Sequence, residues 1–208
     1  MHMMQSFPIP ARRRELESSV RRAREGLVRA RAETNEERVH QLLGLAWVGD
    51  HPGTLQALAE ALIQRQRADG GWAQLAALES DAYGTGQSLF ALMEGAMIAP
   101  GHPAIRRGLT FLRRTQLADG TWHVRSRTHP FQPPMDSGFP HGRDGWISAA
   151  GTSWAVMSLA TSLDPAQPPP PAPVPAKSAD TAPMTSHESK PVDFARDIQP
   201  VLERSCVT

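Results

Sequence analysis

A seven-residue pattern that occurs twice constrains the fold of this chain more than any other feature of its sequence. Residues 66–72 read QRADGGW, and residues 116–122, fifty positions later, read QLADGTW. Each copy follows a segment in which apolar residues recur at helical spacing. A repeat of this period is typical of stacked helical hairpins that cannot bury their apolar faces alone. The sequence therefore predicts an all-α fold built from neighbouring hairpins.

The pattern itself predicts a turn that closes a helix. In each copy we expect the helix to end near the glutamine, the Asp-Gly pair to form a tight turn, and the tryptophan to cover that turn. A buried glutamine amide can hold backbone groups that the end of a helix leaves unbonded. We therefore interpret six residues as a structural repeat: Gln66, Gly70, Trp72, Gln116, Gly120 and Trp122.

A second internal similarity follows each turn, but at a different spacing. Residues 84–92, GTGQSLFAL, align with residues 151–159, GTSWAVMSL, at an offset of 67 rather than 50. The second unit therefore holds about seventeen extra residues between its tryptophan and its next helix. A loop of this length usually has a function.

The Gln-x-x-x-Gly-x-Trp spacing of both copies resembles the repeat of the squalene cyclase and protein prenyltransferase superfamily. The resemblance covers roughly residues 39–162. It implies a partial α/α-toroid of stacked helical hairpins, in which inner and outer helices alternate around a central apolar cavity. It also implies an apolar small molecule or a polymer as the ligand.

Helical spacing extends over most of the first 163 residues. We expect helices over about 11–34, 35–46, 54–66, 82–94, 103–115 and 146–162. No segment alternates apolar and polar residues in the way that predicts a strand.

Composition divides the chain into four predicted parts. Residues 1–34 are expected to form a charged amphipathic helix, and residues 35–163 the repeat domain. Residues 164–190 are rich in Pro and Ala and are predicted to be a disordered linker. Residues 191–208 are expected to begin another domain with a short helix.

Charge and apolar content exclude several classes of protein. The chain has 22 Lys and Arg against 21 Asp and Glu, so we expect no large basic surface and no nucleic-acid partner. It has no run of 18 apolar residues, so no transmembrane segment is expected. Its single cysteine, Cys206, excludes internal disulfides and a cysteine-based zinc site within this chain, and we predict no metal site.

The chemistry of the resembled enzymes is not carried over with the repeat. Squalene cyclases use an Asp-x-Asp-Asp acid, which this chain lacks. The prenyltransferases hold zinc with Asp, Cys and His, and the only cysteine here lies beyond the linker. The remaining catalytic candidates are Asp81, which is either an acid or a helix N-cap, and His141 with Asp144.

His141 and Asp144 lie in the segment 123–146, which contains the extra residues of the second unit. Two interpretations of this segment are open: a proton-transfer pair or ligand clamp, and a proline-stiffened loop whose charges pair with one another. Asp144, Gly145 and Trp146 also read as a degenerate third copy of the turn, which would make Asp144 structural.

The last residues resemble the opening of c-type cytochrome domains, where Asp-Phe-x-x-Asp-Ile-x-Pro-x-Leu leads into Cys-x-x-Cys-His. Here residues 193–202 read DFARDIQPVL, and Cys206 follows. Because haem attachment needs two thiols and an axial histidine, Cys206 is half of a haem site at best, and this chain alone is expected to hold no cofactor. The resemblance implies a longer parent with haem c, a redox partner and export to the periplasm, although no signal peptide opens this chain.

Two functions remain open at this stage. The first is a binding or scaffold module linked to a c-type cytochrome for electron transfer. The second is an isomerase or lyase of the terpene cyclase type, with Asp81, His141 and Asp144 as acid and base candidates.

Overall fold

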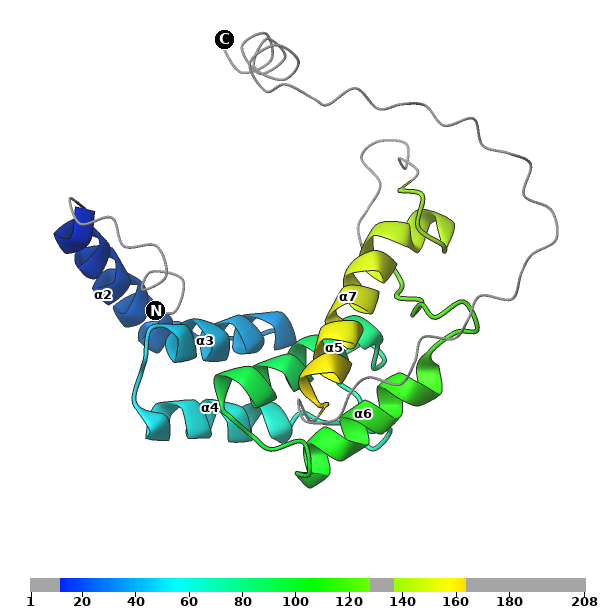
Figure 1. The fold of residues 1–208 in the computed structure, drawn as a ribbon, viewed down its shortest axis with the longest axis horizontal. Coiled ribbons are helices and arrows are strands. Elements are labelled where there is room, and N and C mark those ends of the chain that lie inside the picture. Colours follow the sequence, from blue (N-terminus) through cyan, green and yellow to red (C-terminus); the bar gives the residue numbers. More distant parts are fainter. Residues whose placement is uncertain (1–11, 128–136, 164–208) are drawn as a thin grey trace, which may run out of the picture. The chain divides into compact units, whose positions relative to one another are not determined.

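The computed structural model describes residues 12–127 and 137–163, which form six α-helices and no strand (Figure 1). The α-helices are α2 (Arg13–Arg29), α3 (Asn35–Trp47), α4 (Pro52–Ile63), α5 (Ala82–Phe90), α6 (Pro103–Thr115) and α7 (Gly145–Thr161). A π-helical turn, η2 (Ala91–Gly95), continues α5, and a 3-10 turn, η3 (Gly142–Asp144), precedes α7. The predicted all-α class is thereby confirmed.

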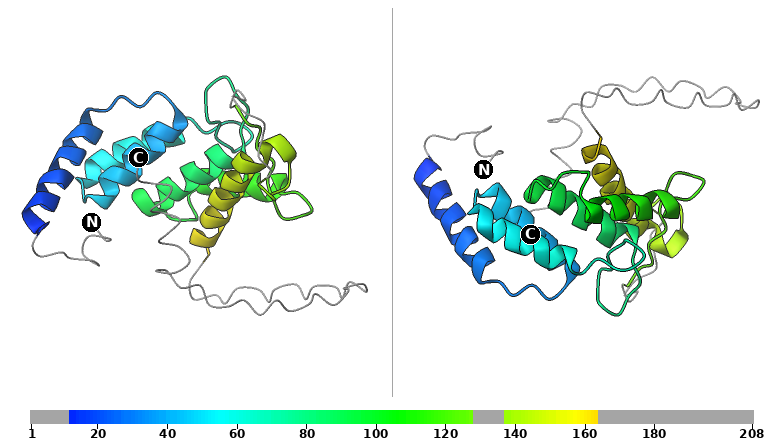
Figure 2. Two further views of the ribbon diagram at one scale, coloured as in Figure 1. Left: turned by 90° about the horizontal axis from the view of Figure 1, so that it is seen from above. Right: turned by 90° about the horizontal axis from the view of Figure 1, so that it is seen from below.

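The helices from α3 to α7 alternate between two layers. α5 packs along α7, and through η2 it also packs against α3, so these three helices form one layer. α4 lies on α3 and α6 lies on α5, which gives the second layer; Figure 2 shows the helices from two further directions. The hydrophobic core includes Trp72 and Trp122, which are the largest fully buried side chains of the described residues.

α2 is shorter than the sequence predicted because a strong start signal follows it. Thr34 accepts a hydrogen bond from the backbone of Glu37, and the Glu37 carboxylate accepts from the backbone of Thr34, so a capping box begins α3. The chain turns to an extended conformation at Ala30. The Gln41 amide then donates to the carbonyls of Leu27 and Ala30, which fastens the end of α2 to α3.

α4 and α6 begin in the same way. Pro52 and Pro103 occupy the first turns of these helices, and the preceding histidines, His51 and His102, accept hydrogen bonds through Nδ1 from backbone amides two residues on. This cap explains why α4 begins two residues before the predicted position, Thr54. The His-Pro pair before α4 is readable in the sequence, but the expected start at Thr54 did not use it.

The predicted linker over 164–190 and the cytochrome-like segment with Cys206 lie outside the described residues. Within the part of the chain that is described, no helix has both the length and the apolar content needed to cross a membrane.

Candidate functional site

The two repeated turns have the same backbone geometry. Gly70 and Gly120 have φ angles of +90° and +84°, a conformation that glycine adopts without steric cost. In each turn the glycine amide donates to the carbonyl three residues earlier, at 2.9 Å. The aspartates Asp69 and Asp119 accept from the backbone amide two residues later, also at 2.9 Å. The turns are therefore equivalent local structures.

Each turn is closed by its tryptophan. Trp72 Nε1 donates to the carbonyl of Leu62, and Trp122 Nε1 donates to the carbonyl of Leu112, both at 2.8 Å. These carbonyls belong to the last turns of α4 and α6. The indole, and not the glutamine, therefore bonds the end of the helix. Gln66 and Gln116 instead hold the turns, through bonds from Nε2 to the carbonyls of Gly70 and Gly120.

A threonine hydroxyl completes each turn. The backbone amide of Trp72 donates to Thr85 Oγ1 at 2.9 Å, and that of Trp122 donates to Thr152 Oγ1 at 3.1 Å. The two threonines are equivalent under the offset of 67, so the insertion lies between Trp122 and α7. The alignment of the two Gly-Thr pairs in the sequence already indicated that the threonines are equivalent, although their role in closing the turns was not predicted.

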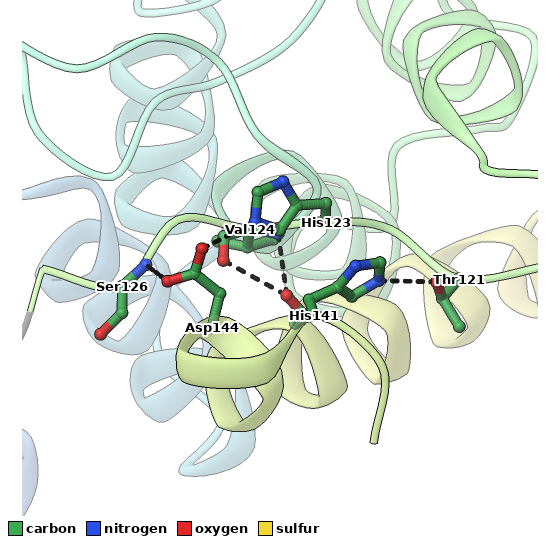
Figure 3. Close-up of polar contacts among 7 residues, drawn as sticks. Thr121, His123, Val124, Ser126, His141 and Asp144 are labelled. Carbon is green, nitrogen blue, oxygen red and sulfur yellow. Dashed lines mark hydrogen bonds and ion pairs between the residues drawn. The ribbon is translucent and has the colours of Figure 1, made fainter. Parts of the chain in front are cut away.

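Beside the second turn, the described parts of segment 123–146 form a polar cluster (Figure 3). His123 Nε2 lies 2.7 Å from Asp144 Oδ2, and the Ser126 amide donates to Asp144 Oδ1 at 2.9 Å. His141 Nε2 lies 2.9 Å from Thr121 Oγ1, and its ring contacts that of His123 at a centroid distance of 5.0 Å, tilted by 36°. The imidazole partner of Asp144 is therefore His123, which sequence reasoning had not selected, and not His141.

The hydrogen bonds to Asp144 favour its charged form. The pKa of Asp144 is lowered from its ordinary value, mainly by the bond from the Ser126 amide and then by that from His123. A carboxylate held in this way is ionised at neutral pH, and it is suited to orient His123 rather than to donate a proton.

Asp81 occupies a different environment. It is the N-cap of α5, where its Oδ1 accepts from the Gly84 amide at 2.7 Å and its Oδ2 accepts from Gln74 Nε2 at 2.7 Å. Burial raises the pKa of Asp81, and the hydrogen bonds from Gly84 and Gln74 oppose this rise. Of the two roles predicted for Asp81, the cap is thus the one seen directly in the geometry.

A cavity of about 590 Å³ connects these two regions. Its wall includes Asp81 with its partner Gln74, and His123 with Ser126, so polar residues from both regions line one space. Asp144 and His141 do not line it. The rest of the wall is mainly polar or charged, with Glu79, Arg125 and Arg127 beside the apolar Ala77 and Leu78.

The degenerate third turn expected at Asp144-Gly145-Trp146 is not formed. Gly145 has φ −55° and is the first residue of α7, and the side chain of Trp146 is 61% exposed. The residues therefore begin a helix instead of closing one.

Within residues 12–127 and 137–163, no three His, Cys, Asp or Glu side chains gather in a way that could hold a metal ion. Cys206, the half-site expected for haem, lies outside the described residues. No known protein-family profile matches the chain, and no curated protein matches it.

Proposed function

We propose that residues 35–163 are a binding module without cyclase activity, and that the Pro-rich linker joins this module to a c-type cytochrome domain of a longer, exported protein. The alternation of α3 to α7 between two layers supports the partial α/α-toroid that the repeat resemblance implies. The cytochrome half of the proposal rests on the sequence pattern that precedes Cys206.

The observation that carries the proposal is the state of the two carboxylates. Both oxygens of Asp81 accept hydrogen bonds, one of which caps α5. Both oxygens of Asp144 are bonded as well, to Ser126 and His123. A general acid needs a carboxyl proton aimed at the substrate. The role of both carboxylates is therefore structural first: Asp81 holds the start of α5, and Asp144 holds the loop that carries His123 and Ser126.

The cavity wall narrows the class of ligand. Arg125 and Arg127 line the space beside the acidic Glu79 and Asp81, and neither arginine forms an ion pair within the described residues. Guanidinium groups bind phosphate and carboxylate with good geometry. Ala77 and Leu78 supply apolar contact area in the same wall. We therefore propose a ligand with an anionic head and an apolar body, in place of the purely apolar ligand that the resemblance implied.

The terpene cyclase alternative retains one observation in its favour. The raised pKa of Asp81 increases the protonated fraction of a carboxyl that lines the cavity, and a proton donor needs that state. An experiment on this protein must therefore distinguish binding from turnover.

Farnesyl diphosphate and farnesol form a matched pair of probes, because they share the apolar chain and differ in the anionic head. We expect calorimetry to detect binding of farnesyl diphosphate to the 208-residue chain, and at least tenfold weaker binding of farnesol. Arg125→Gln with Arg127→Gln should remove this difference. Equal binding of both probes, or none, contradicts the proposed ligand class.

Product analysis separates the two functions. We expect gas chromatography to show no cyclised product after long incubation with farnesyl diphosphate or squalene. A cyclic product that disappears in Asp81→Asn would establish the enzyme alternative. The cytochrome half is tested by the genomic reading frame, where the proposal requires a Cys-His pair directly after Thr208.

A further inference from the structure

The two equivalent turns differ in what covers them. Gly70 is buried, and a Cβ placed on it would lie 2.7 Å from the carbonyl oxygen of Arg107 in α6. Gln66 Nε2 donates at 2.8 Å to two carbonyls, that of Gly70 in its own turn and that of Ala104 in the first turn of α6. The Arg107 guanidinium in turn donates to Gln66 Oε1. The first turn is thus joined to the start of the next second-layer helix.

The second turn presents the same groups without that cover. Gln116 Nε2 donates to the carbonyl of Gly120 at 2.9 Å, and within the described residues it has no second acceptor equivalent to Ala104. A Cβ placed on Gly120 would meet nothing within 4 Å. All of residues 116–120 are exposed, and the Leu117 side chain is 42% exposed. We call residues 116–120 the open turn.

The start of α4 resembles the start of α6, which is the part that contacts the first turn. His51-Pro52 begins α4 with the imidazole cap that His102-Pro103 provides for α6. In α6, Ala104 follows this pair and is buried, being 2% exposed, where the first turn covers it. In α4, Gly53 occupies the corresponding place and is exposed together with His51 and Pro52. We call residues 51–53 the α4 start.

We propose that the open turn of one copy of this chain binds the α4 start of a second copy. Each chain carries counterparts of both halves of the joint that it forms internally between its first turn and α6, with Gln56 in the place of Arg107. The two halves lie at different places on the surface, so the contact is heterologous and copies associate head to tail.

Apolar side chains flank both halves of the proposed joint. Leu117 belongs to the open turn, and Trp47, which is 57% exposed, lies four residues before His51. Burial of exposed apolar surface at a contact is favourable and supports association. A second copy is favoured over an unrelated partner because it supplies the same His-Pro helix start that the first turn already receives.

Two arginine substitutions test the joint separately. Ala118 is the counterpart of Ala68, which lines a cavity of about 420 Å³ with Pro103 at the internal joint. Ala118→Arg therefore blocks the open turn, and Gly53→Arg blocks the α4 start. Both positions are exposed. Circular dichroism and thermal unfolding establish that each variant is folded, and Ala160→Arg, at an exposed position of α7, is the matched control.

Sedimentation velocity of the 208-residue chain at increasing concentration gives the measurement. We expect the average mass of the wild type and of Ala160→Arg to rise beyond that of a dimer, and each blocked variant to remain a monomer. An equimolar mixture of Ala118→Arg and Gly53→Arg keeps one intact copy of each half, so we expect it to stop at twice the monomer mass.

Three results would overturn the proposal. The first is a wild type that stays monomeric at every concentration. The second is a folded Ala118→Arg or Gly53→Arg that associates as the wild type does. The third is an equimolar mixture that remains monomeric or grows beyond the dimer. None of these readouts depends on the ligand of the cavity, so the joint and the proposed binding function fail independently.

Discussion

The indole Nε1 of Trp122 donates a 2.8 Å hydrogen bond to the carbonyl oxygen of Leu112, ten residues earlier in the chain. The bond is buried and joins the second turn to the end of α6. Trp122→Phe keeps an aromatic ring and removes the donor. We expect it to lower the free energy of unfolding by about 1–3 kcal/mol, because among the described residues the Leu112 carbonyl keeps only its bond from Thr115 and the smaller ring leaves a cavity in the core. Urea unfolding measures this change.

Trp72→Phe removes the equivalent bond to Leu62 and should cost a similar amount. If both variants unfold at the same urea concentration as the wild type, the indole bonds do not stabilise the turns.

The paired turns allow a comparison of two glycines with the same backbone strain. Gly120→Ala should cost about 1–2 kcal/mol, because alanine is disfavoured at positive φ. Gly70→Ala carries that penalty and also places Cβ 2.7 Å from the Arg107 carbonyl oxygen. We therefore expect Gly70→Ala to be the more destabilising of the two in urea unfolding. Equal losses would show that the first turn is not tightly held against α6.

The contact between α5 and α7 depends on a glycine for a different reason. A Cβ on Gly86 would lie 2.6 Å from the backbone carbon of Trp154, so the two helices could not keep their present separation. We expect Gly86→Ala to destabilise the protein by about 1–3 kcal/mol, as overpacking does. Thermal unfolding followed by circular dichroism gives the shift.

Gly26→Ala is the matched control, because Gly26 lies within α2 and a Cβ there meets nothing within 4 Å. Helix propensity alone should raise stability by roughly 0.5–1 kcal/mol at this position. A loss of stability in Gly26→Ala comparable to that in Gly86→Ala would contradict the role of close approach.

The lowered pKa of Asp144 leads us to expect that the free energy of unfolding falls in acid. Its folded pKa lies below the unfolded value of about 3.9, so its contribution is present above that value and is lost as the pH falls through the folded pKa. Asp144→Asn should therefore be less stable than the wild type at pH 6, and the difference should shrink below about pH 4. Urea unfolding across this range tests the sign. A difference that does not change with pH would show that Asp144 has no shifted pKa.

For Asp81 we expect the opposite dependence of stability on pH. Its folded pKa is raised, so its charged form disfavours the folded state, and stability falls as the pH rises from the unfolded pKa to the folded one. In Asp81→Asn the Oδ1 atom of the new asparagine can still accept from the Gly84 amide and cap α5. Gln74 Oε1 has no partner among the described residues, and rotation of the Gln74 amide turns this oxygen toward the NH₂ group of the asparagine. We expect the variant to match or exceed the wild-type stability at pH 7. A large loss at pH 7 would mean that burial does not penalise the Asp81 charge.

Local signals were sufficient to predict much of the fold. The bounds of α6 agree with the expected 103–115, because Pro103 marks its start and the turn pattern marks its end. The C-terminal bound of α2 was wrong, because the expected helix ran to Thr34, the N-cap of α3, whereas the chain becomes extended at Ala30. The π-helical turn at Ala91–Gly95 had no recognised sequence signal, and the expected helix simply ran through it.

The polar cluster was less predictable because it depends on tertiary contacts. His141 is three positions from Asp144 and was the natural partner by proximity in sequence. The structure pairs Asp144 with His123, 21 positions away, because the chain returns to the second turn before α7 begins. Asp81 was easier to interpret, since a short acidic residue before a helix is a common N-cap.

The second unit accepts its additional segment without disturbing the bond between Trp122 and Thr152, which at 3.1 Å is close to the 2.9 Å of its counterpart in the first unit. The bond that closes the turn is thus kept in the unit with the additional segment, and His141 of that segment adds a contact to Thr121 of the same turn. We expect the additional segment to tolerate changes of length or sequence while the supporting helices are retained. A foreign peptide can be inserted at the same place on the same principle.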